Sequence, residues 1–352
     1  MSTDWAHSLS DAFATPIGQQ ETRLADGLYG LEIDPVQESE AAWGSVQGYL
    51  QQLFTVGREV SIEAEELLVF PGLEELFALL RILDISESGR FDVLIVDCAP
   101  TGETLSLLKF PEMLGQFVRK MLPIKRKAVQ VAGPAVSKLT HIPMPEESVF
   151  DEIERLTQRL EDLQAVMSDK SNVSLRIVTT TERIVIQEAK RNFTWLQLYD
   201  YNVDAVIVNR LYPDEALSGY FAHWADLQRR GLTELRESFA DIPLFTMALK
   251  PRELKTLPEL LLAAEELYGS CDPLPVLAQK TIFTVSRDGD DWLFAMALAF
   301  ADKSRLELSQ QGGELVIGVE NTWRRILLPD KLQGLQVQSA RLTDGVLKVR
   351  LH

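Results

Sequence analysis

The fold is decided by the stretch Asp97-Cys98-Ala99-Pro100-Thr101-Gly102-Glu103-Thr104-Leu105, which directly follows the apolar run Val93-Leu94-Ile95-Val96. The apolar run predicts a buried strand, and the proline and glycine after it predict a loop. A buried strand that ends in aspartate and opens into such a loop is typical of α/β proteins that present a carboxylate to a nucleotide-bound metal. The sequence therefore indicates a phosphate-handling site at Asp97.

The loop that normally cradles the phosphates has no counterpart in this sequence. The pattern G-x-x-x-x-G-K-S/T, whose backbone N–H groups and lysine bind the β- and γ-phosphates, occurs nowhere in the 352 residues. The chain thus suggests an ATPase without the part most needed for ATP hydrolysis. We expect it to bind ATP poorly.

Composition sets the class of protein. A chain of 352 residues with 46% hydrophobic residues predicts two domains, or one large domain with an appendage. The net charge of −17 argues against duplex nucleic acid or an anionic membrane as the main partner. No apolar run approaches the roughly 18 residues of a transmembrane helix, and no signal peptide is evident. The two cysteines, Cys98 and Cys271, fit a reducing cytoplasm and supply no thiolate zinc site.

Residues 1–270 alternate short apolar runs with helical patterns, which predicts a doubly wound, mostly parallel α/β sheet. The strand candidates are Leu67–Phe70, Val93–Val96, Leu175–Val178, Ala205–Val208 and Pro243–Phe245, and the helix candidates are Glu74–Leu83, Thr104–Met121, Ile184–Leu198, Glu215–Phe239 and Glu253–Tyr268.

Residues 105–170 depart from this alternation because they read as helical without an intervening strand. Apolar residues from Val149 to Met167 step by three and four, which predicts one apolar stripe on a charged helix. Two interpretations stay open. The helices could simply pack on the sheet, or they could form a helical insert with an apolar groove for hydrophobic clients.

From about residue 280 the apolar residues alternate with a period of two, as in Trp292–Leu298, Leu306–Leu308, Leu315–Val319, Ile326–Leu328 and Leu347–Leu351. Gly312-Gly313 and Asp344-Gly345 predict hairpin turns between such strands. We therefore predict an antiparallel β-sandwich over residues 280–352, joined by a linker at 271–279 to a first domain at 1–270.

Several separated motifs occur in an order that matches one family. They are Ser2 to Asp11, Pro71 to Glu75, Asp97 to Leu108, Glu182 with Glu188 and Arg191, Val206 to Arg210, and Leu249 to Leu257. Together they resemble the ArsA family of anion-transporting ATPases, which includes a factor that targets tail-anchored membrane proteins. The resemblance covers residues 1–270. The C-terminal segment resembles the α-crystallin, or small heat-shock, β-sandwich through Gly312 to Ile317, Arg324 to Pro329 and Ala340 to Leu347.

The resemblance implies ATP and Mg²⁺ as cofactors, a homodimer, and a role for individual residues. Asp4 matches the first switch aspartate, which orients the water that attacks the γ-phosphate. Asp97 matches the residue that holds Mg²⁺ through water. The remaining matches are Thr101 and Gly102 in the second switch, Asn209 and Leu249 at the adenine, and Glu182 near the dimer interface and the nucleotide. Each also has a plain structural interpretation: Asp4 as a cap, Asp97 as a strand end, Asn209 as a turn residue.

The start of the chain departs from the family. In relatives the Ser-Thr-Asp switch follows a first strand, the phosphate loop and its helix, a unit that this sequence lacks ahead of Ser2. We expect that the reading frame begins at an internal methionine through a misassigned start or a truncation. The alternative is a genuine pseudoenzyme without a phosphate loop. The absent central strand would also leave an unpaired strand edge.

Two functions follow from this interpretation. The first is a cytoplasmic ArsA-type ATPase that couples ATP binding and hydrolysis to the handling of a hydrophobic helix or membrane-protein client, with hydrolysis impaired in this chain. The alternative is a non-hydrolysing, client-binding protein of the chaperone type. Arsenite transport is not expected, because Cys98 and Cys271 cannot form a trithiolate site.

Overall fold

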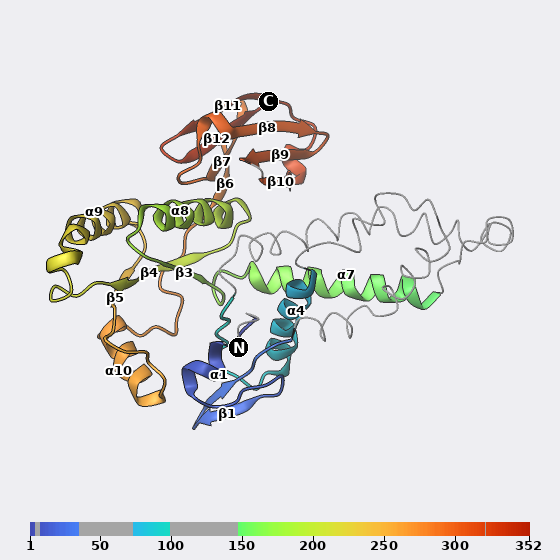
Figure 1. Cartoon of the computed structure of the whole chain (residues 1–352). Helices are drawn as coiled ribbons and strands as arrows, with labels where there is room; N and C mark the ends of the chain where they lie inside the picture. The colour runs from blue at the N-terminus through green and yellow to red at the C-terminus, as the bar shows by residue number, and fades with distance from the viewer. Residues whose placement is uncertain (4–7, 35–72, 99–146, 321) are drawn as a thin grey trace, which may run out of the picture. The chain divides into compact units, whose positions relative to one another are not determined.

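The computed structural model describes residues 1–3, 8–34, 73–98, 147–320 and 322–352. The chain divides into two compact units, Met1–Met167 and Ser168–His352, whose elements are shown in Figure 1. The predicted strand Leu67–Phe70 and most of the predicted helical insert at 105–170 lie outside the described residues.

The first unit contains α1 (Ser8–Phe13), the hairpin of β1 (Thr22–Ala25) and β2 (Leu28–Gly30), α4 (Leu73–Ser88) and α7 (Glu147–Met167). The periodicity from Val149 to Met167 correctly predicted α7. Its stripe residues Leu156, Leu160 and Leu163 are buried, as are Leu79, Leu80 and Leu83 of α4. The two helices pack together, and Arg159 of α7 pairs with Asp84 of α4 at 2.5 Å.

A short parallel arrangement surrounds the N-terminal residues. Ser2 forms parallel bridges with both Glu32 and Asp97, so the backbone of residues 1–3 lies between two other segments. The prediction of a buried strand over Val93–Val96 is wrong. Residues 93–96 have no strand assignment, the bridge with Ser2 is made by the next residue, Asp97, and Val93 and Ile95 are 45% and 71% exposed. The apolar character of the run therefore does not reflect burial in this structure.

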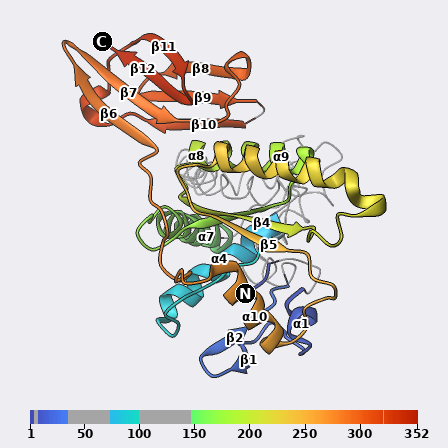
Figure 2. The same cartoon turned by 90° about the vertical axis from the view of Figure 1, so that its left-hand side faces the viewer.

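The α/β part of the second unit holds a parallel sheet of order β3-β4-β5 in the described residues. The strands are β3 (Leu175–Thr179), β4 (Val203–Leu211) and β5 (Leu244–Ala248). Figure 2 shows α8 (Arg183–Leu198) and α9 (Ala222–Ser238) on one face of the sheet and α10 (Leu257–Tyr268) on the other. The predicted alternation of parallel strands and helices is present in this unit. Its central strand is fully buried at Ala205, Val206 and Val208.

Two predicted helices begin later than their apolar pattern suggested. The helix expected from Glu215 begins at Ala222, because the preceding chain forms turns and the short 3₁₀ helix Gly219–Phe221, with Gly219 at φ 58°. The helix expected from Glu253 begins at Leu257, after Thr256 in an extended conformation and with a proline in its first turn.

The rest of the second unit is a β-sandwich. One sheet has the order β10-β9-β8 and the other β11-β12-β7-β6 within the described residues. The strands are β6 (Phe283–Asp288), β7 (Asp291–Ala297), β8 (Leu306–Gln311), β9 (Glu314–Val319), β10 (Thr322–Leu327), β11 (Val337–Thr343) and β12 (Val346–Leu351). The predicted hairpin at Asp344-Gly345 is confirmed, since both residues have positive φ and β11 pairs antiparallel with β12.

Side chains of the α/β part hold the segment that leads into the sandwich. Asp204 accepts a hydrogen bond from the Leu277 N–H at 2.9 Å, and Arg176 donates to the carbonyl of Pro273 at 2.7 Å. The Asn202 amide donates to the carbonyl of Ala278 at 2.8 Å. The connection between sheet and sandwich is therefore fixed by several polar contacts.

The C-terminal half of α8 contacts the sandwich. Gln197 Oε1 accepts from the Ala299 N–H at 2.8 Å, and the Tyr199 hydroxyl donates to the carbonyl of Trp323 at 2.7 Å. The ring of Phe300, which has φ 65°, lies 5.9 Å from Phe193 and 5.5 Å from Phe239 between ring centroids. Aromatic contacts and hydrogen bonds from side chains to the backbone thus join the sandwich to α8.

Candidate functional site

The structure holds the backbone of Asp97 in place from the N-terminal side. Its N–H donates to the carbonyl of Met1 at 2.9 Å, and its carbonyl accepts from the Thr3 N–H at 2.9 Å. Ser2 and Thr3 are buried, whereas Asp97 itself is exposed. The residue predicted to serve Mg²⁺ therefore combines a fixed backbone with a carboxylate that solvent can reach.

An ionised carboxylate on a fixed backbone suits a hard cation such as Mg²⁺, which is bound through one or two carboxylates and keeps several waters. Across the parts of the chain that the structure describes, no three His, Cys, Asp or Glu side chains gather into a metal cage.

The Asp97 carboxylate also affects the pKa of the neighbouring Cys98 thiol. Although the residue as a whole is exposed, desolvation of its thiol raises the pKa of Cys98, a hydrogen bond with Thr3 opposes this, and the charge of Asp97 raises the pKa further. At neutral pH the thiol form is favoured. Cys98 is consequently a weak nucleophile in this environment.

The two residues predicted at the adenine lie at the carboxyl ends of neighbouring parallel strands. Asn209 is the third residue from the end of β4, and Leu249 directly follows β5. The Leu249 N–H donates to the carbonyl of Leu211 at 2.7 Å, which ties the two strand ends together. Leu249 is 42% exposed and Asn209 partly buried. This edge is where open α/β sheets bind their ligands.

Asn209 sits in a β-bulge. Val208 pairs with Thr246 and Leu211 with Ala248, so Asn209 and Arg210 oppose the single residue Met247. Arg210 takes up the extra length in the left-handed region at φ 58°, and its N–H donates to Asn209 Oδ1 at 2.8 Å. Bulges often re-aim a side chain beside a functional site. The bulge leaves the Asn209 amide group next to the ligand edge of the sheet.

Glu182 is the residue that immediately precedes α8. It has extended backbone angles, is exposed, and its carbonyl accepts from the Ile186 N–H at 2.9 Å, while its carboxylate makes no capping hydrogen bond. The adjacent Thr181 lies against α9, because a Cβ placed on Gly231 would stand 2.4 Å from the Thr181 carbonyl oxygen. The glycine therefore permits α9 to approach the segment that carries Glu182.

The remaining predicted site residues, Asp4, Thr101 and Gly102, lie outside the described residues. Asn209 and Leu249 are brought together in the second unit, and Asp97 is placed with Ser2 and Thr3 in the first. Sequence reasoning missed Gln228 of α9. Its side chain donates to the Tyr212 carbonyl and accepts from the Tyr212 N–H just after β4. No sequence motif marks such a contact, because it depends on how α9 folds back.

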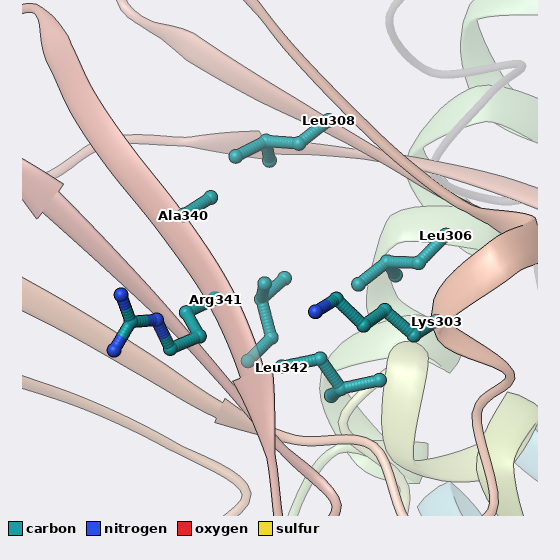
Figure 3. Close-up of a pocket in the computed structure, with 7 residues that line it drawn as sticks. Lys303, Leu306, Leu308, Ala340, Arg341 and Leu342 are labelled. Atoms are coloured by element: carbon teal, nitrogen blue, oxygen red, sulfur yellow. The ribbon is translucent and has the colours of Figure 1, made fainter.

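A cavity of about 230 Å³ lies elsewhere, between β8 and β11 of the sandwich. Its lining is mainly aliphatic, and Figure 3 shows the Lys303 amine directed toward it while the Arg341 side chain extends away. The lining residues are Lys303, Leu306, Leu308, Ala340, Arg341, Leu342 and Leu347. None of the predicted nucleotide residues that the structure describes lines this cavity.

None of the helices within the described ranges has the length and apolar character needed to cross a membrane. This finding concerns α7, α8, α9 and the other helices given above.

Comparison with known proteins agrees with these features. The family described as anion-transporting ATPase matches residues 1–269, and an HSP20-like domain found in ArsA matches residues 289–351. A putative arsenical pump-driving ATPase of Chlorobaculum tepidum is 31% identical over 352 residues, which cover 99% of this chain and 87% of the relative.

Two further relatives come from other organisms. Putative arsenical pump-driving ATPase 1 of Aquifex aeolicus is 30% identical, over 97% of this chain and 89% of its own length. ATPase ASNA1 homolog 1 of Paramecium tetraurelia is 26% identical, over 72% of this chain and 78% of its own length. With a family match over residues 1–269 and relatives at 30% identity or more along nearly the whole chain, the protein belongs to the ArsA family of anion-transporting ATPases and carries the HSP20-like domain found in ArsA.

Proposed function

We propose that this chain is an ATP-binding protein of the ArsA type, in which Asn209 and Leu249 contact the adenine and Asp97 serves Mg²⁺ through water. The observation that carries the proposal is the 2.7 Å hydrogen bond from the Leu249 N–H to the Leu211 carbonyl, which ties Leu249 to the end of β4, two residues beyond Asn209. A carboxamide can donate to and accept from the N6/N7 edge of adenine. Leu249, partly exposed beside it, offers an apolar surface for the face of the base.

The roles of the other predicted residues belong to the same proposal. Asp4 would orient the attacking water, and Thr101 and Gly102 would contact the γ-phosphate as the second switch. Bound Mg²⁺ would supply charge neutralisation on the phosphates. Glu182 would respond to the nucleotide or to the second subunit of a homodimer. Its place at the start of α8 supports this role, because a helix terminus moves with the element that it begins.

Client handling rests on the family and on the sequence between residues 105 and 170. We propose a hydrophobic helix or membrane-protein segment as the client, handled in the cytoplasm. Two relatives are named as putative arsenical pump-driving ATPases, and that name describes the relatives and not this chain. For this chain a metalloid client is disfavoured, since its only cysteines are Cys98 and Cys271.

We further propose that these 352 residues hydrolyse ATP little or not at all. The reason is the lack of a G-x-x-x-x-G-K-S/T motif in the sequence. Phosphate release from Mg-ATP, measured on the chain as given, should therefore stay at the background rate. Joining a glycine-rich phosphate loop with its strand and helix ahead of Met1 should restore turnover, and Asp4→Asn should abolish the restored activity.

The alternative function is a non-hydrolysing, client-binding protein of the chaperone type. The two functions can be distinguished experimentally in the chain that is extended by a phosphate loop. Restored turnover that depends on Asp4 identifies an ATPase. A chain that stays inactive after extension, yet prevents aggregation of a hydrophobic helix without ATP, supports the binding protein.

Base preference tests the adenine site directly. Binding of ATP and GTP, each with Mg²⁺, can be followed by saturation-transfer NMR, which detects weak ligands. The chain should prefer ATP, and Asn209→Ala should remove the preference. Equal binding of the two nucleotides by the unmodified chain would overturn the assignment of Asn209.

A further inference from the structure

We propose that Gln228 is a positioning residue for the adenine site: its carboxamide fixes the peptide of Tyr212 and thereby locks the bulge that presents Asn209. The inference rests on the proposed function, because it concerns the same site. Gln228 belongs to α9 and lies 19 residues beyond Asn209 in the sequence.

The contact is a two-way clamp at the point where β4 ends. Gln228 Oε1 accepts from the Tyr212 N–H at 2.8 Å, and Gln228 Nε2 donates to the Tyr212 carbonyl at 3.0 Å. Tyr212 follows the last residue of β4, so no neighbouring strand supplies these two bonds within the described sheet. One side chain therefore replaces the pairing that a further strand residue would have made.

The bulge is consequently held on both of its sides. On the strand side Val208 pairs with Thr246 of β5. On the far side Leu211 is tied to Leu249, and Tyr212 to Gln228. Because both flanks are fixed, the extra residue has to be absorbed at Asn209 and Arg210. A non-glycine residue such as Arg210 stays in the left-handed region only when its surroundings hold it there.

Aromatic packing reinforces the same peptide. The Tyr212 ring is stacked 5.8 Å from Phe221 and lies 6.0 Å from Trp224, between ring centroids. Both partners stand at the start of α9, the helix that carries Gln228. The first two turns of α9 thus hold Tyr212 by its backbone and by its ring.

Loss of the clamp frees the end of β4 to slip by one residue. The bulge and the strained Arg210 then relax, and the Asn209 amide leaves the position from which it reads the base. GTP does not present the adenine N6/N7 pattern, so its binding gains nothing from that position. The expected effect is about a tenfold loss of ATP affinity with GTP affinity unchanged, which corresponds to ~1.4 kcal/mol.

The experiment compares ATP and GTP affinities, each nucleotide with Mg²⁺, for the full chain, Gln228→Met and Gln228→Glu. Methionine keeps the shape and removes both bonds, whereas glutamate keeps only the acceptor for the Tyr212 N–H. The ratio of ATP to GTP affinity should collapse in Gln228→Met and fall partway in Gln228→Glu. Amide hydrogen exchange of Tyr212 should speed up in the same order.

A matched control exists in the sandwich. Gln310 makes a similar clamp there: its Oε1 accepts from the Val337 N–H at 2.9 Å, and its Nε2 donates to the Leu335 carbonyl at 2.6 Å and to the Gly312 carbonyl at 3.2 Å. Gln310→Met should cost similar stability and leave the nucleotide ratio unchanged.

The outcomes distinguish this inference from the function on which it rests. An unmodified chain without base preference overturns the adenine site and the role of Gln228 together. An unmodified chain that prefers ATP, with a Gln228→Met variant that exchanges the Tyr212 amide quickly but keeps the full preference, overturns the positioning role alone. A ratio that collapses equally in Gln310→Met shows general destabilisation and also overturns it.

Discussion

Arg176 and Asp204 form an ion pair at 3.2 Å between the two neighbouring strands β3 and β4, and the Asp204 side chain is fully buried. The pair also holds the segment that follows α10, since Arg176 donates to the carbonyl of Pro273 and Asp204 accepts from the Leu277 N–H. A buried charge pair contributes most when its remaining hydrogen-bonding atoms are satisfied. Here the backbone of the connecting segment supplies one further partner to each of the two side chains.

Removing the carboxylate should therefore be costly. Asp204→Ala leaves the Arg176 guanidinium, 24% exposed, without its partner. We expect a loss of about 3 kcal/mol in the free energy of unfolding, measured by urea denaturation. The double variant Arg176→Met with Asp204→Ala should lose less than the sum of the single changes. Strict additivity would show that the pair is not coupled.

Gly231 offers a test of close packing between α9 and Thr181. Alanine in a helix normally gains about 1 kcal/mol over glycine. At Gly231 the added Cβ would meet the Thr181 carbonyl at 2.4 Å. We expect Gly231→Ala to lower the free energy of unfolding by about 1–3 kcal/mol in spite of that gain. Gly18→Ala serves as control, because no atom lies within 4 Å of its added Cβ; a stabilised Gly231→Ala would contradict the close approach.

The charge of Asp97 should be visible at Cys98. Asp97→Asn removes a negative charge that raises the pKa of the Cys98 thiol. The pKa should fall, although desolvation, the larger cause, keeps it raised. In a Cys271→Ser background, alkylation by iodoacetamide should then accelerate at pH 8, and its pH profile should move to lower pH. An unchanged profile would mean that the carboxylate does not act on the thiol.

Phe300 should anchor the sandwich to α8. Phe300→Ala removes a ring that contacts Phe193 and Phe239 and lies under the Lys190 ammonium at 5.5 Å. We expect a loss of about 2 kcal/mol and faster proteolysis in residues 269–279. Phe283→Ala is a matched control, since Phe283 is 38% exposed and Phe300 39%, but Phe283 stacks on Phe294 within the sandwich. Equal proteolysis of both variants would argue against an anchor.

The sequence predicted those elements whose pattern reflects burial. The cores of β3, β4 and β5 and nearly all of α8 and α7 appear where apolar runs or stripes placed them. The strands β6 and β11 were not predicted, because most of their side chains are exposed and no apolar alternation marks them. For Val93–Val96 the error was the reverse: a strand was predicted where none is found. An apolar run indicates that burial would be favourable, but it does not show which other segment would cover it.

The site was predictable only in part. Asp97 was predicted from the apolar run and the loop around it, and Asn209, Leu249 and Glu182 from family motifs. The structure adds that the strand ends carrying Asn209 and Leu249 are tied together. The bulge at Asn209 and the clamp by Gln228 could not be predicted. Both depend on register between β4 and β5 and on the return path of α9, which no local pattern encodes.

The helix α8 begins directly after Glu182 and, at its other end, holds the sandwich through Gln197 and Tyr199. Its 16 residues make a stiff rod of about 24 Å. A tilt of about 5° at the first end shifts the second by roughly 2 Å over that length. A tilt of α8 that starts at Glu182, the residue proposed to respond to the nucleotide, would therefore displace the β-sandwich at the other end of the helix.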